Sequence, residues 1–215
     1  MTVDGSPAHL GQKVDPETAR VIVDGLPLPI RPGLVHYLVN KPRGVVSTAD
    51  DPQGRPIVVD LVPAGTRVYP VGRLDADSEG LMIITNDGDL TEAVTHPSHG
   101  VTKTYLARVQ GDIGRAALRQ LTDGVGLDDG PAAALSARLI DRNRGETLVE
   151  VVMGEGRKRE VRRMFSAVGH EVVQLVRIAI GPVRDPDLGV GEWRLLSTAE
   201  VRSLYGAARP SGPPA

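Results

Sequence analysis

The chain contains no cysteine among its 215 residues. It therefore cannot form disulfide bonds, a cysteine-ligated zinc site or a thiol nucleophile. Metal ligation by histidine is not indicated either, because the histidines lack metal-ligand spacing. They are His9, His36, His96, His99 and His170. We expect neither a metal nor another cofactor.

Aromatic residues are also scarce, at 3% of the chain. This scarcity argues against a nucleic-acid binder built on rows of stacking aromatic side chains. No run of about 18 apolar residues is present, and the N-terminus lacks the basic and apolar pattern of a secretion signal. We therefore expect a cytoplasmic protein, with a core built mostly from valine, leucine, isoleucine and alanine.

The net charge of −2 is a mild argument against a nucleic-acid partner, because such domains are often basic. The distribution of charge weakens this argument. Residues 154–163 carry five cations and two acids, a local charge of 5 − 2 = +3. A local basic groove matters more for binding phosphates than the total charge does.

Hydrophobic patterning predicts strands at residues 35–39, 81–85, 103–109, 135–140, 147–153 and 172–180. It predicts helices at residues 89–95, 113–121 and 158–168, and a last helix that begins at the capping box of residues 197–200 and ends near Gly206. Strands and helices mix without regular β-α-β alternation. This favours an α+β fold with a mixed, mostly antiparallel sheet.

The helix predicted at residues 158–168 has two different faces. Its apolar residues recur at i, i+3, i+4 and i+7, which makes one buried stripe; they are Val161, Met164, Phe165 and Val168. Its basic residues lie on another face, where they are free to line a cleft; they are Arg159, Arg162 and Arg163.

The chain divides into three parts by composition. Residues 1–33 hold one short strand-like piece, at residues 20–23, followed by an Asp24-Gly25 turn, and are too short to form a core of their own. Residues 34–206 form the main domain. Residues 207–215 contain three prolines and a glycine, and we expect them to be disordered.

The most informative run is residues 72–81, Gly-Arg-Leu-Asp-Ala-Asp-Ser-Glu-Gly-Leu. Asp75 follows Arg73 by two residues and precedes the apolar run at residues 81–84. A carboxylate beside a cation, on a turn packed against a buried strand, can be held ionised and in place.

This run resembles the signature of the pseudouridine synthases, in the "GRLD…S/T-E-G-L…TNDG" form of the branch that modifies bacterial ribosomal RNA, the RsuA/RluB type. The resemblance implies that Asp75 is the catalytic residue. It also implies the family fold, in which two halves of sheet and helix meet at a central cleft. The halves would divide near Gly100, with Asp75 at the cleft floor. Residues 1–33 would be the remnant of a small RNA-binding domain, whereas the residues themselves favour a loosely ordered leader with one strand that packs on the main domain.

Two further segments resemble motifs of the same family in the same order. Lys103-Thr104-Tyr105 matches a "K-x-Y" motif, which implies that Tyr105 stacks on the target base and can assist proton removal. Residues 155–164 match "EGRnrQvRRM", which implies that Arg162 pairs with the catalytic Asp. Lys158 and Glu160 depart from this second pattern, because they stand where Asn and Gln are common.

The resemblance also implies residues that contact RNA. Arg73 matches an arginine beside the extruded nucleotide, although a salt bridge to Asp77 or Glu79 is an alternative role. Residues 41–45 match a block that fixes a turn near the cleft, with Lys41 or Arg43 touching phosphate. Further candidates for a backbone clamp are Lys103, Arg157, Lys158, Arg159 and Arg163.

The resemblance implies an isomerase that converts a uridine of ribosomal RNA to pseudouridine without a cofactor, and we expect the large-subunit RNA rather than the small-subunit RNA as the substrate. We expect a monomer whose partner is ribosomal RNA or a ribosomal precursor particle. One alternative is an RNA-binding assembly factor of the same fold without catalysis. Another is a glycoside hydrolase that uses Asp75 together with Asp77 or Glu79 as its two carboxylates.

Overall fold

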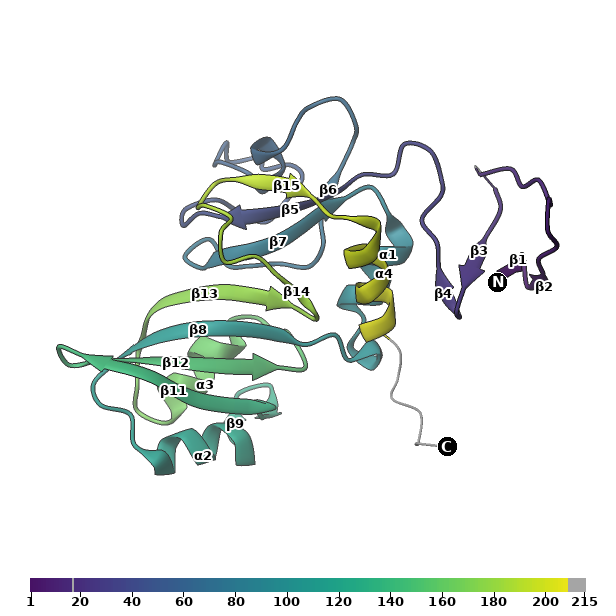
Figure 1. Ribbon diagram of the computed structural model, residues 1–215. Helices are drawn as coiled ribbons and strands as arrows, with labels where there is room; N and C mark the ends of the chain where they lie inside the picture. The colour runs from purple at the N-terminus through teal and green to yellow at the C-terminus, as the bar shows by residue number, and fades with distance from the viewer. Residues whose placement is uncertain (17, 209–215) are drawn as a thin grey trace.

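The computed structural model describes residues 1–16 and 18–208. Within them, one mixed sheet of nine strands forms the body of the molecule (Figure 1). The strand order is β11-β12-β8-β13-β7-β5-β15, with β14 beside β13 and β6 beside β7. The strands are β5 (His36–Lys41), β6 (Tyr69–Pro70), β7 (Glu79–Thr85), β8 (Lys103–Gln110), β11 (Ser136–Asn143), β12 (Glu146–Met153), β13 (Val172–Ile180), β14 (Val183–Arg184) and β15 (Trp193–Leu195).

Helices pack beside this sheet in two groups. Figure 1 shows α2 and α3 beside strands β8, β11 and β12, and α1 and α4 together at the end of β5 and β7. The α-helices are α1 (Gly88–Thr95), α2 (Arg115–Asp123), α3 (Glu160–Ala167) and α4 (Thr198–Ala207), and 3-10 turns lie at Val58–Leu61 and Pro97–His99. The predicted α+β class with a mostly antiparallel sheet is confirmed. No described helix is long and apolar enough to cross a membrane.

The two parts of the sheet meet where β13 runs parallel to β7, through only two residue pairs. Gly80 forms one of these pairs with Arg177. Its backbone has φ +109°, and a Cβ there would lie 2.2 Å from the Arg177 carbonyl oxygen. Only glycine permits so close an approach, so the joint between the two parts depends on this residue.

The predicted division near Gly100 is only partly right. Residues 36–85 and 103–180 do form separate parts of the sheet, but the end of the chain returns to the first part. There, β15 pairs with β5 and α4 packs against α1. The sequence does not predict that the end of the chain returns to the first part, because the return depends on pairing between residues about 150 positions apart.

Helix α3 begins at Glu160, two residues later than predicted. Arg159 is its N-cap and has a left-handed backbone, with φ 51°, so the helix cannot extend further back. The predicted apolar stripe is confirmed, since Val161, Met164 and Phe165 are buried. The helix ends at Ala167 with Val168 as its C-cap, and Gly169 follows with a left-handed backbone, at φ +83°.

The N-terminal residues form a small separate sheet at the side of the molecule (Figure 1). The Asp24-Gly25 turn joins two of its strands, and Arg202 of α4 donates to the Val23 carbonyl at 3.2 Å. Its strands are β1 (Thr2–Val3), β2 (Ser6–Pro7), β3 (Val21–Val23) and β4 (Leu26–Pro27). Of the predicted tail, Ala207 ends α4 and Ala208 is its C-cap, while residues 209–215 lie outside the described residues.

Candidate active site

Asp75 lies on the loop between β6 and β7, and hydrogen bonds to the backbone of this loop hold it in place. The Ser47 hydroxyl donates to the Leu74 carbonyl at 2.7 Å and accepts from the Leu74 amide at 3.1 Å. The Gly44 amide donates to the Ala76 carbonyl at 2.7 Å. The predicted role of residues 41–45, to fix a turn near the cleft, is therefore confirmed.

Lys41 takes part in this scaffold and does not reach solvent. It is fully buried, and its ammonium group donates to the carbonyls of Pro42 and Val45 at 2.9 and 2.8 Å. The suggestion that Lys41 touches phosphate is corrected, because the group already serves buried carbonyls that would lose their donor. Arg43 on the same turn is exposed.

Asp75 and Tyr105 face a common cavity of about 350 Å³. Tyr105 is 8% exposed, and on β8 it lies opposite Val151 of β12 and Arg177 of β13. The cavity is also lined by the exposed cations Arg73, Lys158 and Arg159. Asp75, Tyr105 and these basic residues, which come from three separate segments of the chain, thus line one cavity.

The cation next to Asp75 is not the predicted one. Arg159 lies 3.9 Å from the Asp75 carboxylate and binds Asp77 through both of its terminal nitrogens, at 3.1 and 3.2 Å. Arg162 instead donates to the backbone carbonyls of Asp77 and Val172, and its charge lies 3.4 Å from the Asp77 carboxylate. No direct Asp75–Arg162 ion pair forms among residues 1–16 and 18–208, so that predicted pairing is corrected.

Two neighbouring acids thus have different surroundings. Burial by itself would raise the pKa of Asp77, but the hydrogen bond and charges of Arg159 and Arg162 outweigh it and hold that pKa below its ordinary value. Asp75 makes no side-chain hydrogen bond within the described part of the chain and has a side chain 31% exposed to the cleft. Asp77 thus pairs with two arginines, whereas the Asp75 carboxylate has only the 3.9 Å contact with Arg159 among the described residues.

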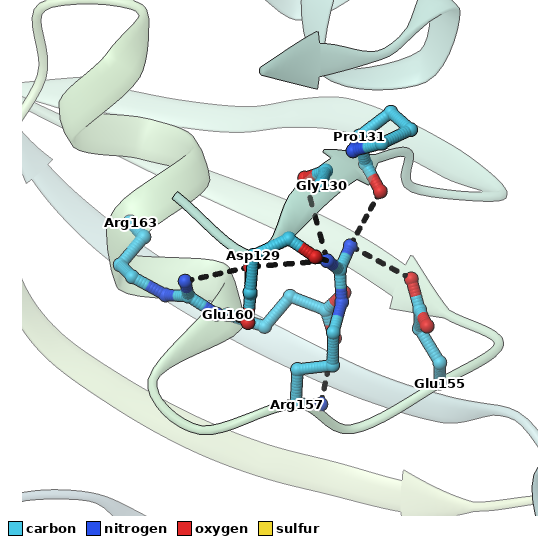
Figure 2. Close-up of polar contacts among 7 residues, drawn as sticks. All are labelled: Asp129, Gly130, Pro131, Glu155, Arg157, Glu160 and Arg163. Atoms are coloured by element: carbon cyan, nitrogen blue, oxygen red, sulfur yellow. Dashed lines mark hydrogen bonds and ion pairs between the residues drawn. The ribbon is translucent and has the colours of Figure 1, made fainter. Parts of the chain in front are cut away.

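Arg157 and Arg163 are held by the hairpin of β9 (Val125–Leu127) and β10 (Gly130–Ala132). Figure 2 shows both guanidinium groups directed at Asp129, with Arg163 bound through two contacts of 2.9 Å and Arg157 through one of 3.1 Å. Arg157 also donates to the Gly130 and Pro131 carbonyls. Both side chains join the hairpin to α3, and their predicted place in an RNA clamp stays a prediction.

Glu160, which departs from the family pattern, belongs to the same network (Figure 2). Its side chain is 3% exposed and accepts from the backbone amide and the Nε of Arg157, at 3.1 and 3.0 Å. Glu160 lines the Asp75 cavity, but its carboxylate is paired there with Arg157.

Comparison with known proteins agrees with this geometry. Residues 35–167 match the family model described as RNA pseudouridylate synthase, which covers well over half of the chain. The chain belongs to the RNA pseudouridylate synthase family. The RNA pseudouridine synthase class expected from the sequence is thereby confirmed.

Individual relatives extend the likeness over almost the whole chain. An uncharacterized RNA pseudouridine synthase of Mycobacterium leprae is 46% identical over 94% of this chain and 81% of its own length. Ribosomal large subunit pseudouridine synthase B of Bacillus subtilis is 39% identical over 93% of this chain and 82% of its own. A crystal structure of a pseudouridylate synthase superposes with a TM-score of 0.72 at 27% identity, over 94% and 87% of the two chains.

The remaining residues that were predicted to contact RNA differ in exposure and in hydrogen bonding. Arg43, Arg73 and Lys158 make no hydrogen bond or ion pair within the described residues, and all three are exposed. The alternative salt bridge of Arg73 is not formed, because Asp77 is held by two other arginines and Glu79 accepts from Gln174. Lys103 is partly buried and donates to the Val94 carbonyl at 3.1 Å. Of the three exposed cations, Arg73 and Lys158 line the cavity that Asp75 faces.

Sequence reasoning missed two residues that the structure places at the site. One is Ser47, which holds the Asp75 loop and carries no pattern that sets it apart. The other is Arg177, which is 4% exposed on β13. A signal for Arg177 was present, because strand alternation puts it on the same face as the buried Leu175 and Ala179. No group of three or more potential metal ligands occurs among the described residues.

The buried lysines predict a rise of stability at alkaline pH. Burial lowers the pKa of Lys41 and, helped by the charge of Arg177, that of Lys103, each from 10.5 to about 8. Between these values the unfolded chain binds more protons than the folded protein, so the free energy of unfolding increases with pH. Tyr205 acts in the opposite direction above pH 10, because burial raises its pKa.

Urea unfolding at pH 7.5 and pH 9.5 tests this expectation. Each lysine should contribute a rise of about 1 kcal/mol or more between the two conditions. Lys103→Met should remove its share of the rise, while Arg119→Met, at an exposed position on α2, should leave the rise unchanged. A wild-type stability that is flat or falling over this interval would contradict the burial of the two charges.

Proposed function

We propose that this protein converts a uridine of large-subunit ribosomal RNA to pseudouridine, with Asp75 as the reacting group. The observation that carries the proposal is the difference between the acids at the cleft. Asp75 faces the cavity beside Tyr105 with one distant cation, whereas Asp77 and Glu79 are occupied by other side chains. The relative from Bacillus subtilis, named for the large ribosomal subunit, supports the choice of RNA.

The reaction is an isomerisation, so all atoms of the substrate are kept. The bond between ribose C1′ and uracil N1 breaks, the base rotates, and C1′ joins C5 while the C5 proton is lost and N1 gains one. Asp75 acts either as a nucleophile or by removing a proton to form a glycal-like intermediate. Both routes need an ionised carboxylate, and Arg159 at 3.9 Å favours that form.

The other cleft residues are assigned by position. Tyr105 offers a flat ring with a hydroxyl that can stack on the base and exchange a proton. Arg162 acts indirectly, because its hydrogen bonds to the Asp77 and Val172 carbonyls hold the Asp75 loop against β13. Arg43, Arg73 and Lys158 are free to contact RNA phosphates, which position the substrate without reading its sequence.

The alternatives fit the cleft less well. A glycoside hydrolase needs a second carboxyl that can donate a proton, but Asp77 is held ionised by Arg159 and Arg162. A non-catalytic assembly factor needs no free Asp75 beside Tyr105. We further propose that residues 1–33 assist RNA binding, that the protein acts as a monomer, and that it works in the cytoplasm, where its RNA substrate is made.

Purified protein with transcripts of the large- and small-subunit RNA tests the proposal. We expect pseudouridine, measured by chromatography of digested nucleosides, to form in the large-subunit transcript, with one modified residue per molecule at most. Formation only in the small-subunit transcript would overturn the choice of RNA. Absence of the product from both transcripts and from isolated precursor particles would overturn the activity.

A further inference from the structure

A second cavity, of about 230 Å³, adjoins the one that contains Asp75. Both cavities are lined by Arg73, Tyr105 and Arg157, but Asp75 lines only the first. The second is instead bordered by Lys103 on β8 and Arg177 on β13. Tyr105 therefore borders both the cavity that Asp75 faces and the neighbouring cavity with Lys103 and Arg177.

Arg177 is unusual among the residues that line this cavity because its charged side chain is almost completely buried. It is 96% buried, since its exposed fraction is 4%, and it is fixed by one hydrogen bond of 2.7 Å from Nε to the Leu81 carbonyl. Its Nη2 is buried without a hydrogen-bond partner. Protein interiors rarely leave a charged donor unpaired, because its lost hydration is then not replaced.

In the described part of the chain, Lys103 adds a second cation without a carboxylate partner to the lining of this cavity. Within the described residues its ammonium group donates only to the Val94 carbonyl, and burial followed by the charge of Arg177 lowers its pKa to about 8. Within the described residues, no carboxylate lies at ion-pair distance from Lys103, Arg177 or Arg73. The acid in the lining, Glu155, is bound to Arg157 at 3.1 Å.

Three cations without a paired carboxylate thus border one small cavity. Arg177 is buried and Lys103 is partly buried, and keeping these two charges there is costly unless a counter-charge arrives from outside. Arginine and lysine together suit the oxygens of a phosphate group, through directed donors and a mobile point charge. The shared lining with the Asp75 cavity places that group next to the target nucleotide.

We propose that this cavity binds a backbone phosphate of the RNA adjacent to the target uridine, through Lys103 and Arg177. The inference rests on the proposed function for the identity of the RNA, but the anion site itself does not. The phosphate would supply the missing counter-charge and fix the nucleotide on the side of Tyr105 away from Asp75. The site adds a positioning role for Arg177, which no motif had marked.

The first test uses inorganic phosphate and the isolated full-length protein. The Nε–H of Arg177 is held by the Leu81 carbonyl, so its ¹⁵N–¹H signal can be followed during a phosphate titration at constant ionic strength set with chloride. We expect a saturable shift in wild type and Lys103→Arg. The shift should be lost in Lys103→Met and kept in Arg119→Met, which removes an exposed cation on α2. A signal that does not respond in wild type overturns the anion site.

The second test measures binding of the large-subunit transcript at several salt concentrations. Lys103→Met should weaken binding about tenfold at low salt. It should also reduce the slope of log affinity against log salt by about 0.7 to 0.9, the loss of one phosphate contact. Arg119→Met should change neither value.

The combined results separate the possible sources of the anion. A phosphate shift without any change of salt slope in Lys103→Met would mean a site for free phosphate, and would overturn the RNA contact. Failure of the proposed activity would appear separately, as absent turnover by wild type, and would leave the phosphate titration readable. Both responses together support a backbone phosphate beside the target nucleotide.

Discussion

Asp75→Asn should reduce the rate of pseudouridine formation by at least about 10³-fold, the scale seen when a reacting group is removed. The asparagine amide has a shape similar to that of the carboxylate, but it can neither attack C1′ nor act as a base that accepts a proton. RNA binding should remain within about twofold of wild type, because removing one negative charge from a basic cleft does not weaken its attraction for phosphates. Single-turnover rates and filter binding with the same transcript measure the two quantities.

The structure of Asp75→Asn should be preserved, since the Asp75 side chain has only the 3.9 Å contact with Arg159. A useful control is Lys158→Met, which changes an exposed cation in the same cavity. It should weaken binding and its salt dependence while leaving the single-turnover rate at saturating protein nearly unchanged. If Asp75→Asn retained a rate close to wild type, the reacting group would have to be another residue.

Gly80→Ala should destabilise the protein by about 4 kcal/mol or more, in the range reserved for severe core disruptions. The new Cβ would lie 2.2 Å from the Arg177 carbonyl oxygen, and the backbone at φ +109° is one that alanine rarely adopts. The clash falls on the two residue pairs that join β7 to β13. The two parts of the sheet would separate, and with them the walls of the cleft.

Urea unfolding followed by circular dichroism measures this effect. The matched control is Gly126→Ala on β9, where no atom lies within 4 Å of the added Cβ and the backbone is not left-handed. It should change the free energy of unfolding by less than about 0.5 kcal/mol. A Gly80→Ala protein as stable as this control would show that β7 and β13 can move apart without cost.

Much of the fold can be read from local sequence. Residues 147–153 predict β12 almost to the residue, and the stripe of Val161, Met164 and Phe165 predicts the buried face of α3. Both signals are strong because they repeat over several turns or pleats. The predicted first residues of the helices are less accurate. The helix predicted at residues 113–121 begins instead at Arg115, after the N-cap Gly114, which contributes no side-chain hydrogen bond.

The sequence predicts which residues line the cavity better than it predicts which of them form ion pairs. The motifs bring Asp75, Tyr105 and Arg159 to one cavity, yet five cations within residues 157–163 could each have paired with Asp75. Which one does so depends on the left-handed N-cap at Arg159, which turns its side chain back toward the Asp75 loop. Arg157 and Arg163 are taken by Asp129, a residue about 30 positions away with no motif of its own.

The most direct test of the central claim is a carbodiimide primer-extension map of pseudouridine across both ribosomal RNAs. It compares cells that lack this protein with cells that carry wild type or Asp75→Asn. We expect one site in the large-subunit RNA to vanish in the deletion, return with wild type and stay absent with Asp75→Asn. A map that is identical in all three strains would contradict the assignment of a ribosomal RNA uridine as the substrate of Asp75.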